Sequence, residues 1–244
     1  MVPAVGHHDL RLTGNEQGTK SLGRFRSLVS QRDNQRDQAV PDASIVLRMK
    51  IPMAAAVLAG GGSRRMGVPK ASLPYGKTTL LAHQTERLSK MFEEVLVVAK
   101  EAPGFDAGPS RLVLDRTSDQ APIHGLARAL EETSDRLFVL AVDLPAMTDE
   151  VIRIIAERGL ATEAPAILPR AEGRLQPLAA VWRRSVLPAA LRRIARGELS
   201  FYGLAQEVGA EILPEETWLA ADPSGNCFAN INTIEQYNAM RERA

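Results

Sequence analysis

The sequence of 244 residues contains one cysteine, carries a formal net charge of only +1 and has no long apolar run. A single cysteine, Cys227, excludes an internal disulfide framework and a metal site built from clustered cysteines, and it agrees with a reducing cytoplasm. The balanced charge gives no overall electrostatic reason to bind nucleic acid or an anionic membrane, so local structure has to hold any anionic ligand. The chain lacks the run of about 18 apolar residues that indicates a membrane span, and its N-terminus lacks the apolar segment of a secretory signal. We therefore expect a cytoplasmic protein whose partner is a small molecule.

The N-terminal part of the chain differs in composition from the rest. Residues 1–48 are rich in Gly, Ser, Gln, Asn, Asp and Arg and show no sustained apolar period, so we expect a disordered extension. Because Met49 and Met53 stand just before the first convincing strand, this extension is also open to interpretation as a start-site artefact. Residues 49–244 are expected to form the folded domain.

From Met53 onward, apolar segments typical of strands alternate with amphipathic segments typical of helices. This alternation predicts an α/β protein in three α/β/α layers, with a Rossmann-like, mostly parallel central sheet. Strands are expected at residues 53–59, 95–99, 112–114, 137–142, 164–168, 177–182 and 228–233. Helices are expected near residues 80–91, 123–133, 149–158 and 185–196, after the N-cap Ser200, and after Thr233 with Gln236 as a capping box.

The most informative segment is the loop Leu58–Lys70, which reads LAGGGSRRMGVPK and follows the first strand. Its glycines let backbone N–H groups approach a polyphosphate, because no Cβ blocks the approach. Its cations add positive charge, with arginine suited to bidentate phosphate contacts and lysine acting as a point charge. These residues are Gly60, Gly61 and Gly62, followed by Arg64, Arg65 and Lys70. The loop predicts nucleotide binding, and the alternative is a glycine-rich turn that serves packing alone.

Two common phosphate-binding motifs do not fit. A P-loop ending in Gly76-Lys77-Thr78 would need glycine at position 71, which is Ala71, so we expect Gly76 and Lys77 to form a hairpin-like turn. A dinucleotide-binding G-x-G-x-x-G pattern would need glycine where Arg65 stands.

Two aspartates follow predicted strands and should lie at the same edge of the sheet as the loop, where open α/β sheets bind ligands. Asp143 comes directly after an apolar strand and is placed to hold Mg²⁺, which usually keeps waters and takes substrate oxygens. The alternative for Asp143 is a helix N-cap. For Asp115, a cap or turn is as good an interpretation as a ligand contact.

The sequence resembles the molybdenum cofactor guanylyltransferases, which belong to a wider nucleotidyltransferase superfamily. The resemblance covers residues 53–243 and rests on LAGGGSRRMGVPK, Leu114-Asp115, Gly125, Val142-Asp143-Leu144-Pro145, Gln176-Pro177-Leu178 and Asn230-Ile231-Asn232-Thr233. It implies a nucleotidyltransferase domain over residues 49–244 that transfers GMP from GTP to molybdopterin or molybdenum cofactor and releases pyrophosphate, with Mg²⁺ as cofactor. Molybdenum-insertion proteins and molybdoenzyme chaperones are further candidate partners on the same ground.

The resemblance also assigns roles to individual residues. It implies nucleotide contacts from Leu58, Ala59, Gly60, Gly61, Lys70, Asp115 and Asp143, catalytic roles for Arg65, Lys70 and Asp143, Mg²⁺ binding by Asp143, and acceptor contacts from Asn230 and Asn232. Two amides on one strand face could read the edge of a pterin, since an amide both donates and accepts hydrogen bonds. The alternative is a pair of turn-forming asparagines.

The chain departs from the family pattern at two places in the predicted site. Val98 stands where the family often has Asn, so one nucleotide contact is missing or comes from elsewhere. His124 stands within Ala121–Gly125, and we expect it to make local hydrogen bonds, because this kind of transfer needs positioning and charge neutralisation more than a base.

Three other functions remain open from the sequence. A cytidylyltransferase acting on the same cofactor is the nearest, although Gly60 favours guanine, since those relatives tend to have alanine there. A sugar-phosphate-type nucleotidyltransferase is disfavoured by Asn230-Ile231-Asn232-Thr233. A non-catalytic GTP-binding protein that delivers the cofactor would bind GTP without releasing pyrophosphate.

Overall fold

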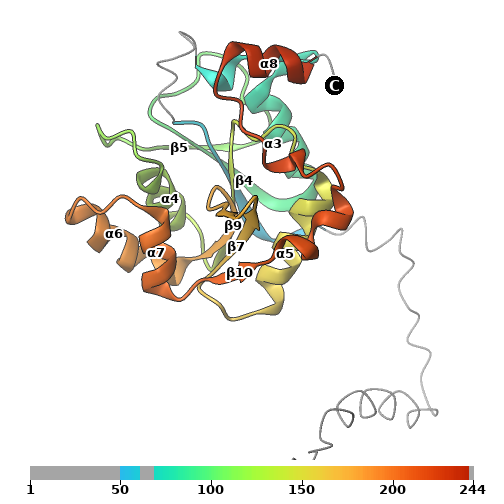
Figure 1. Ribbon diagram of the computed structural model, residues 1–244. Helices are drawn as coiled ribbons and strands as arrows, with labels where there is room; N and C mark the ends of the chain where they lie inside the picture. Colours follow the sequence, from blue (N-terminus) through green and yellow to red (C-terminus); the bar gives the residue numbers. More distant parts are fainter. Residues whose placement is uncertain (1–49, 61–68, 242–244) are drawn as a thin grey trace, which may run out of the picture. The chain divides into compact units, whose positions relative to one another are not determined.

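The computed structural model describes residues 50–60 and 69–241 (Figure 1). The predicted N-terminal extension, residues 1–48, lies outside these ranges, and so do Gly61 and Arg65 of the loop. The described residues all belong to one unit, Leu47–Ala244.

The centre of this unit is a mostly parallel sheet with the strand order β10-β7-β9-β6-β1-β4-β5. Strand β1 pairs in parallel with β4 and β6, and β4 pairs in parallel with β5, whereas β9 runs antiparallel to both β6 and β7. The strands are β1 (Ile51–Leu58), β4 (Phe92–Ala99), β5 (Arg111–Leu114), β6 (Arg136–Ala141), β7 (Ala166–Ala171), β8 (Arg174–Leu175), β9 (Ala179–Arg183) and β10 (Glu211–Leu213). The predicted mostly parallel sheet is confirmed.

Several helices begin at a capping side chain, whereas α4 (Pro122–Glu131) and α6 (Leu187–Ala195) begin without one. Thr79, Thr148 and Ser200 each accept a hydrogen bond from a backbone N–H in the first turn of the helix that follows. The helices are α3 (Leu80–Met91), α4 (Pro122–Glu131), α5 (Asp149–Ala161), α6 (Leu187–Ala195), α7 (Phe201–Val208) and α8 (Ile234–Arg241). The predicted capping box is also present, since Gln236 N donates to Thr233 Oγ1 and Thr233 N donates to Gln236 Oε1, both at 3.2 Å. In residues 50–60 and 69–241 no helix has the length and apolar character needed to cross a bilayer.

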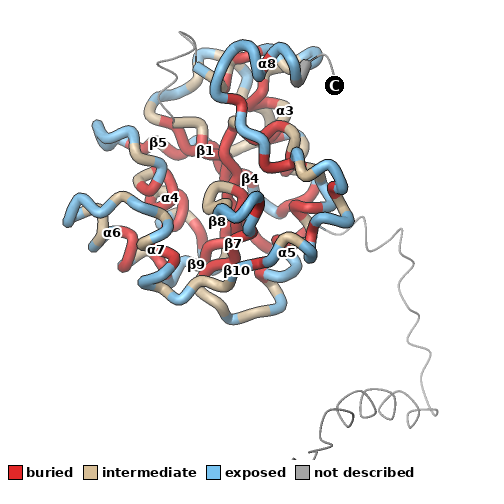
Figure 2. Tube along the Cα trace, in the orientation of Figure 1, coloured by how far each residue is buried: buried red, intermediate tan, exposed pale blue. Residues whose placement is uncertain are grey.

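Helices cover both faces of the sheet. Successive side chains of a strand point to opposite faces, so neighbouring residues pack into different apolar clusters. Val57 belongs to the apolar cluster that includes α3 and α5, whereas its neighbour Leu58 belongs to the cluster that includes α4, α6 and α7. Figure 1 shows these two helix groups on opposite sides of the strands. In Figure 2 the central strands are mostly buried, while the outer sides of the helices are exposed. The predicted α/β/α layering is therefore confirmed.

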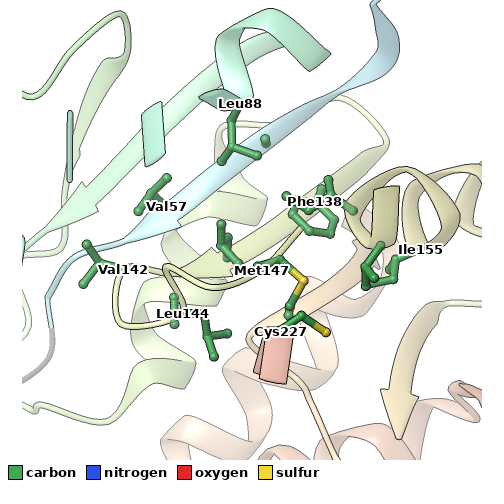
Figure 3. Close-up of a cluster of buried hydrophobic side chains, with 14 of the residues drawn as sticks. Val57, Leu88, Phe138, Val142, Leu144, Met147, Ile155 and Cys227 are labelled. Atoms are coloured by element: carbon green, nitrogen blue, oxygen red, sulfur yellow. The ribbon is translucent and has the colours of Figure 1, made fainter. Parts of the chain in front are cut away.

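Cys227 lies in the apolar cluster on the α3 and α5 side, close to Met147 and Leu144 (Figure 3). It is 1% exposed, and burial, with a further contribution from Asp222, raises the pKa of its thiol well above the ordinary range. A buried, protonated thiol is a poor nucleophile, so this cysteine serves packing.

The prediction differs from the structure in two elements. The strand expected at residues 228–233 is wrong: a 3-10 turn, Asn226–Phe228, is followed by an irregular segment that leads to α8. Its buried side chains, Phe228 and Ile231, are three residues apart, and Ile231 N donates to Asp143 O at 2.9 Å instead of joining the sheet. The short edge strand β10 was not predicted.

The interpretation of Gly76 and Lys77 as a turn is confirmed. They connect β2 (Pro74–Tyr75) to the antiparallel β3 (Thr78–Thr79), and Gly76 has a φ of +60° that favours glycine.

Candidate active site

A cleft opens where β1, β4, β5 and β6 reach their carboxyl ends. Its lining comes from the first residues beyond these strands, from Lys70, and from the start of α4. The lining residues are Leu58, Ala59, Gly60, Lys70, Val98, Ala99, Lys100, Asp115, Gln120, Ala121, Pro122, Gly125, Ala141, Val142, Asp143 and Leu178. The structure therefore brings together the loop start, Asp115 and Asp143, as their positions after parallel strands predicted.

At one end of the cleft, three side chains from distant parts of the sequence meet. Lys70 Nζ donates to Asp143 Oδ2 at 2.8 Å and to Asn232 Oδ1 at 3.1 Å. The side chains of Lys70 and Asp143 are 17% and 23% exposed, so the pair is partly accessible to a ligand. A cation, a carboxylate and an amide thus share one position at this end of the cleft.

Local backbone structure places each of these residues. Lys70 begins a short 3-10 helix, Lys70–Ser72, and its carbonyl accepts a hydrogen bond from Leu73 N at 3.1 Å. Asp143 lies two residues after the end of β6, and its carbonyl holds the segment before Asn232 through the bond from Ile231 N. Asn232 N donates to Gln236 Oε1 at 2.7 Å, which ties Asn232 to the start of α8.

Asp143 is not a helix cap. Helix α5 begins at Asp149, and Thr148 is its N-cap, accepting a hydrogen bond from Val151 N at 3.2 Å. The alternative interpretation of Asp143 is therefore excluded, and its carboxylate is available to the cleft.

The two C-terminal asparagines are not equivalent. Both are exposed, but Asn232 joins the cluster with Lys70, whereas the side chain of Asn230 makes no hydrogen bond among the described residues. The predicted arrangement of both amides on one strand face is wrong, because residues 229–233 form no strand.

The other end of the cleft is organised around Lys100, which the sequence interpretation missed. Lys100 Nζ donates to Asp115 Oδ2 at 2.7 Å, to Thr117 Oγ1 at 2.8 Å and to Thr117 O at 3.1 Å, and it also contacts Asp119 O. Asp115 Oδ1 accepts from Thr117 N at 3.1 Å and from Thr117 Oγ1 at 2.7 Å. Burial favours the neutral carboxyl, but the hydrogen bonds from Lys100 and Thr117 outweigh it and lower the pKa of Asp115, so its carboxylate remains charged.

The sequence held one signal for this pair, since Lys100 directly follows the predicted strand at residues 95–99 and Asp115 directly follows the predicted strand at residues 112–114. The last residues of β4 and β5, Ala99 and Leu114, are register partners, so the next residue on each strand is a neighbour. Asp115 N donates to Ala99 O at 2.9 Å, which continues the ladder into the site.

Between the two ends, the cleft is apolar. Leu58 and Val98 are buried, and a Cβ added to Gly125 would lie 3.6 Å from the Leu58 methyl groups, in ordinary van der Waals contact. Gly60 faces Lys100, since an added Cβ would lie 3.6 Å from Lys100 Cγ. Val98 thus contributes apolar surface where the family often has an amide, and the nearby polar group is Lys100.

His124 does not line the cleft. Its side chain is 10% exposed and borders a separate groove on the outer side of α4, shared with Arg128. Nε2 lies 3.5 Å from Asp119 Oδ2, which is too long for a strong hydrogen bond. Nε2 is buried and has no hydrogen-bond partner within the described residues, so the local hydrogen bonds predicted for the His124 side chain are not found at this atom.

The donor set of the cleft limits which metal it could hold. Within residues 50–60 and 69–241, no group of three or more His, Cys, Asp or Glu side chains is placed to bind one ion. Asp143 offers one partly exposed carboxylate, which fits a hard cation that completes its coordination with water and phosphate oxygens.

Comparison with known proteins agrees with this geometry. The family model described as "MobA-like NTP transferase domain" matches residues 55–208. A Methanosarcina mazei protein named "Probable molybdenum cofactor guanylyltransferase" is 32% identical over 200 residues, which cover 76% of this chain and 88% of that protein. The molybdenum cofactor guanylyltransferase of Syntrophotalea carbinolica is 27% identical over 190 residues, covering 78% of this chain and 90% of that protein.

A solved structure supports the fold assignment. The crystal structure of molybdopterin-guanine dinucleotide biosynthesis protein A from Archaeoglobus fulgidus superposes with a TM-score of 0.68 at 22% identity, covering 78% of this chain and 98% of that one. At this identity the likeness concerns the fold. Together with the family match over more than half of the sequence, it leads to one assignment: the chain belongs to the family of MobA-like NTP transferase domains.

Proposed function

We propose that this protein is a molybdenum cofactor guanylyltransferase, which transfers GMP from GTP to molybdopterin or molybdenum cofactor and releases pyrophosphate. The observation that carries the proposal is the cluster of Lys70, Asp143 and Asn232 at the carboxyl edge of the sheet. In this cluster a lysine, which can bind phosphate, lies within hydrogen-bond distance of a carboxylate, which can bind a metal ion, and of an amide, which can contact the acceptor substrate. The names of the relatives supply the substrate class.

In the proposed reaction, a terminal phosphate oxygen of the acceptor attacks the α-phosphorus of GTP. The bond from the α-phosphorus to the oxygen bridging to the β-phosphate breaks, and that oxygen leaves with the electron pair as part of pyrophosphate. An acceptor phosphate is already ionised at neutral pH, so no proton has to be removed and no general base is needed. This agrees with His124 lying outside the cleft lining.

The protein therefore has to position two polyanions and offset the charge that develops in the transition state. Lys70 is placed to do this, because its ammonium is already held between Asp143 and Asn232 and can turn to phosphate oxygens. We assign the same task to Arg65 and the backbone N–H groups of the glycine loop, and we propose nucleotide contacts from Leu58, Ala59, Gly60 and Gly61. Asn232 is the better candidate for a contact with the acceptor substrate, and Asn230 is an exposed residue near it in the sequence.

We propose that Asp143 holds Mg²⁺ together with the phosphates of GTP. Bound there, the ion would neutralise phosphate charge and polarise the α-phosphorus. For this role Asp143 must exchange its hydrogen bond with Lys70 for the ion, and the Lys70 ammonium would then turn toward the phosphates.

One assay tests the function and separates it from the alternatives. Pyrophosphate release is measured with GTP, CTP, ATP and UTP, each with and without molybdenum cofactor, and with Mg²⁺ or a chelator. We expect release only with GTP, the acceptor and Mg²⁺ together, and a product with the mass of the guanine dinucleotide. Release with CTP would indicate a cytidylyltransferase, and GTP binding without release would indicate a non-catalytic carrier.

A further inference from the structure

We infer that Lys100 recognises the base of the nucleotide by donating a hydrogen bond from Nζ to the O6 acceptor of guanine, and that Asp115 positions the ammonium for this contact. The inference rests on the proposed function and adds to it the side chain that selects the base. Val98 places an apolar side chain in the middle of the cleft, and Lys100 lines the cleft close to it.

The strand order determines which end of the cleft receives the base. Asp143 follows β6, Gly60 follows β1, Lys100 follows β4 and Asp115 follows β5, and these strands are neighbours in that order. Strands in a sheet are about 4.8 Å apart, so three spacings separate the positions of Asp143 and Asp115 by roughly 14 Å. A nucleotide whose phosphates lie at Lys70 and Asp143 therefore extends its base toward Lys100.

Lys100, and not Asp115, is the group that can contact the base. The Asp115 side chain is only 6% exposed, and its two oxygens already accept three hydrogen bonds. The Lys100 side chain is 22% exposed and lines the cleft. Asp115 therefore acts through Lys100, as a positioning residue that fixes the direction of the ammonium.

The ammonium has a selective use at this place. Guanine presents the acceptors O6 and N7 on one edge, whereas adenine presents an amino group in place of O6 and would set a donor against a donor. Nζ has four oxygens around it and only three N–H groups, so a base oxygen can replace the longest of these contacts, the one to Thr117 O at 3.1 Å. A lysine held in this way favours guanine and rejects adenine.

The surroundings of Lys100 suit a planar base. Leu58 and Val98 offer buried apolar surface, and Gly125 of α4 lies beside Leu58. Gly60 leaves the stem of Lys100 open on the cleft side, since a side chain at position 60 would contact Lys100 Cγ. An aromatic base could therefore lie on apolar atoms while its edge meets the ammonium.

The test compares GTP with 2-aminopurine riboside triphosphate, whose base lacks O6 and the N1 hydrogen of guanine, by equilibrium binding to the full-length protein. The variants are Lys100→Met, the double variant K100M/D115N, and the control Lys90→Met, which removes an exposed lysine of α3. The double variant is needed because Lys100→Met leaves a buried carboxylate without its cation and can destabilise the fold. Thermal unfolding of each protein accompanies the binding measurement.

We expect wild type and Lys90→Met to bind GTP about 10- to 100-fold more tightly than the analogue without O6. In Lys100→Met and in the double variant, this difference should shrink by about tenfold or more, through weaker binding of GTP and not through weaker binding of the analogue. Binding of ATP should not weaken. Equal losses for GTP and the analogue, or wild type that does not distinguish them, would overturn the inference and leave Lys100 a structural residue.

Failure of this inference can be told from failure of the proposed function. A wild type that releases pyrophosphate with GTP and molybdenum cofactor, but whose nucleotide preference does not change in the variants, contradicts only the role of Lys100. A wild type that shows the expected binding preference but forms no product contradicts the proposed reaction and leaves the base contact supported.

Discussion

The two ends of the cleft are built in different ways. At the Lys70 end, the hydrogen-bonded side chains are 73 and 162 residues apart in the sequence and remain partly accessible. At the Lys100 end, the polar contacts join residues at most 19 positions apart and enclose an almost fully buried carboxylate.

This difference indicates that the two ends of the cleft have different roles. At the Lys70 end, side chains must give up hydrogen bonds to one another when they bind metal and phosphates. A partly exposed side chain such as Asp143 can make this exchange. A group that selects a ligand benefits from being held in place beforehand, because less ordering is then required on binding. Lys100 has many local contacts and fits the second description.

The largest effect is expected from Asp143→Ala at the reactive end. Loss of the proposed metal ligand should lower kcat for GMP transfer by about 10³-fold, since removing one group that stabilises transition-state charge typically costs that much. Added Mg²⁺ should not restore activity, because the variant lacks the carboxylate proposed to hold the ion. The variant also removes the partner of Lys70. The matched control is Glu150→Gln, an exposed carboxylate on α5 that should leave the rate unchanged. Near-normal turnover of Asp143→Ala would contradict both the metal site and the proposed mechanism.

A smaller effect at the same end is expected from Asn232→Ala. The apparent KM for the acceptor should rise by about tenfold, whereas GTP affinity should change little, because removing one hydrogen bond to a charged partner costs about 1.5–3 kcal/mol. Asn230→Ala serves as the comparison, since Asn230 is exposed and outside the Lys70 cluster. A rise in KM for GTP alone would instead place Asn232 on the nucleotide side.

Much of the fold could be predicted because its signals are local. Apolar strands, amphipathic helices and the caps Ser200 and Thr233 are short-range patterns, and the structure confirms them. The segment from Phe228 to Thr233 has the alternation of a strand, but its N–H groups bind elsewhere, as Ile231 does at Asp143. Whether such a segment joins a sheet depends on which edge is free, and this is a property of the whole fold.

The candidate site could be predicted in part for the same reason. Asp115 and Asp143 were found because each directly follows a strand, where ligands of α/β sheets bind. The meeting of Lys70 with Asn232 joins residues separated by most of the domain and has no local signal. Lys100 also follows a predicted strand, but only the register of β4 and β5 sets it beside Asp115.

At the ordered end, Thr117→Val should affect stability more than chemistry. The Thr117 hydroxyl donates to Asp115 and accepts from Lys100, so its removal should lower the free energy of unfolding by about 1 kcal/mol. GTP affinity should fall a few-fold as Lys100 becomes less fixed, while kcat at saturating substrate should remain close to that of wild type. Chemical denaturation together with GTP titration measures both effects. A large loss of kcat with unchanged stability would remove the distinction between the two ends.

The smallest effect concerns the acid dependence of stability at Asp115. Its pKa is lowered in the folded protein from an ordinary value of 3.8, so the folded state binds its proton less readily than the unfolded state does. The stabilisation that comes from this carboxylate is therefore complete above its unfolded pKa and is lost as the pH falls through its folded pKa. Asp115→Asn lacks this titration, so the difference in unfolding free energy between wild type and variant should shrink progressively below about pH 4. Denaturant unfolding from pH 6 to pH 3 tests this, and a difference that stays constant over that range would mean that Lys100 and Thr117 do not hold the carboxylate in its charged form.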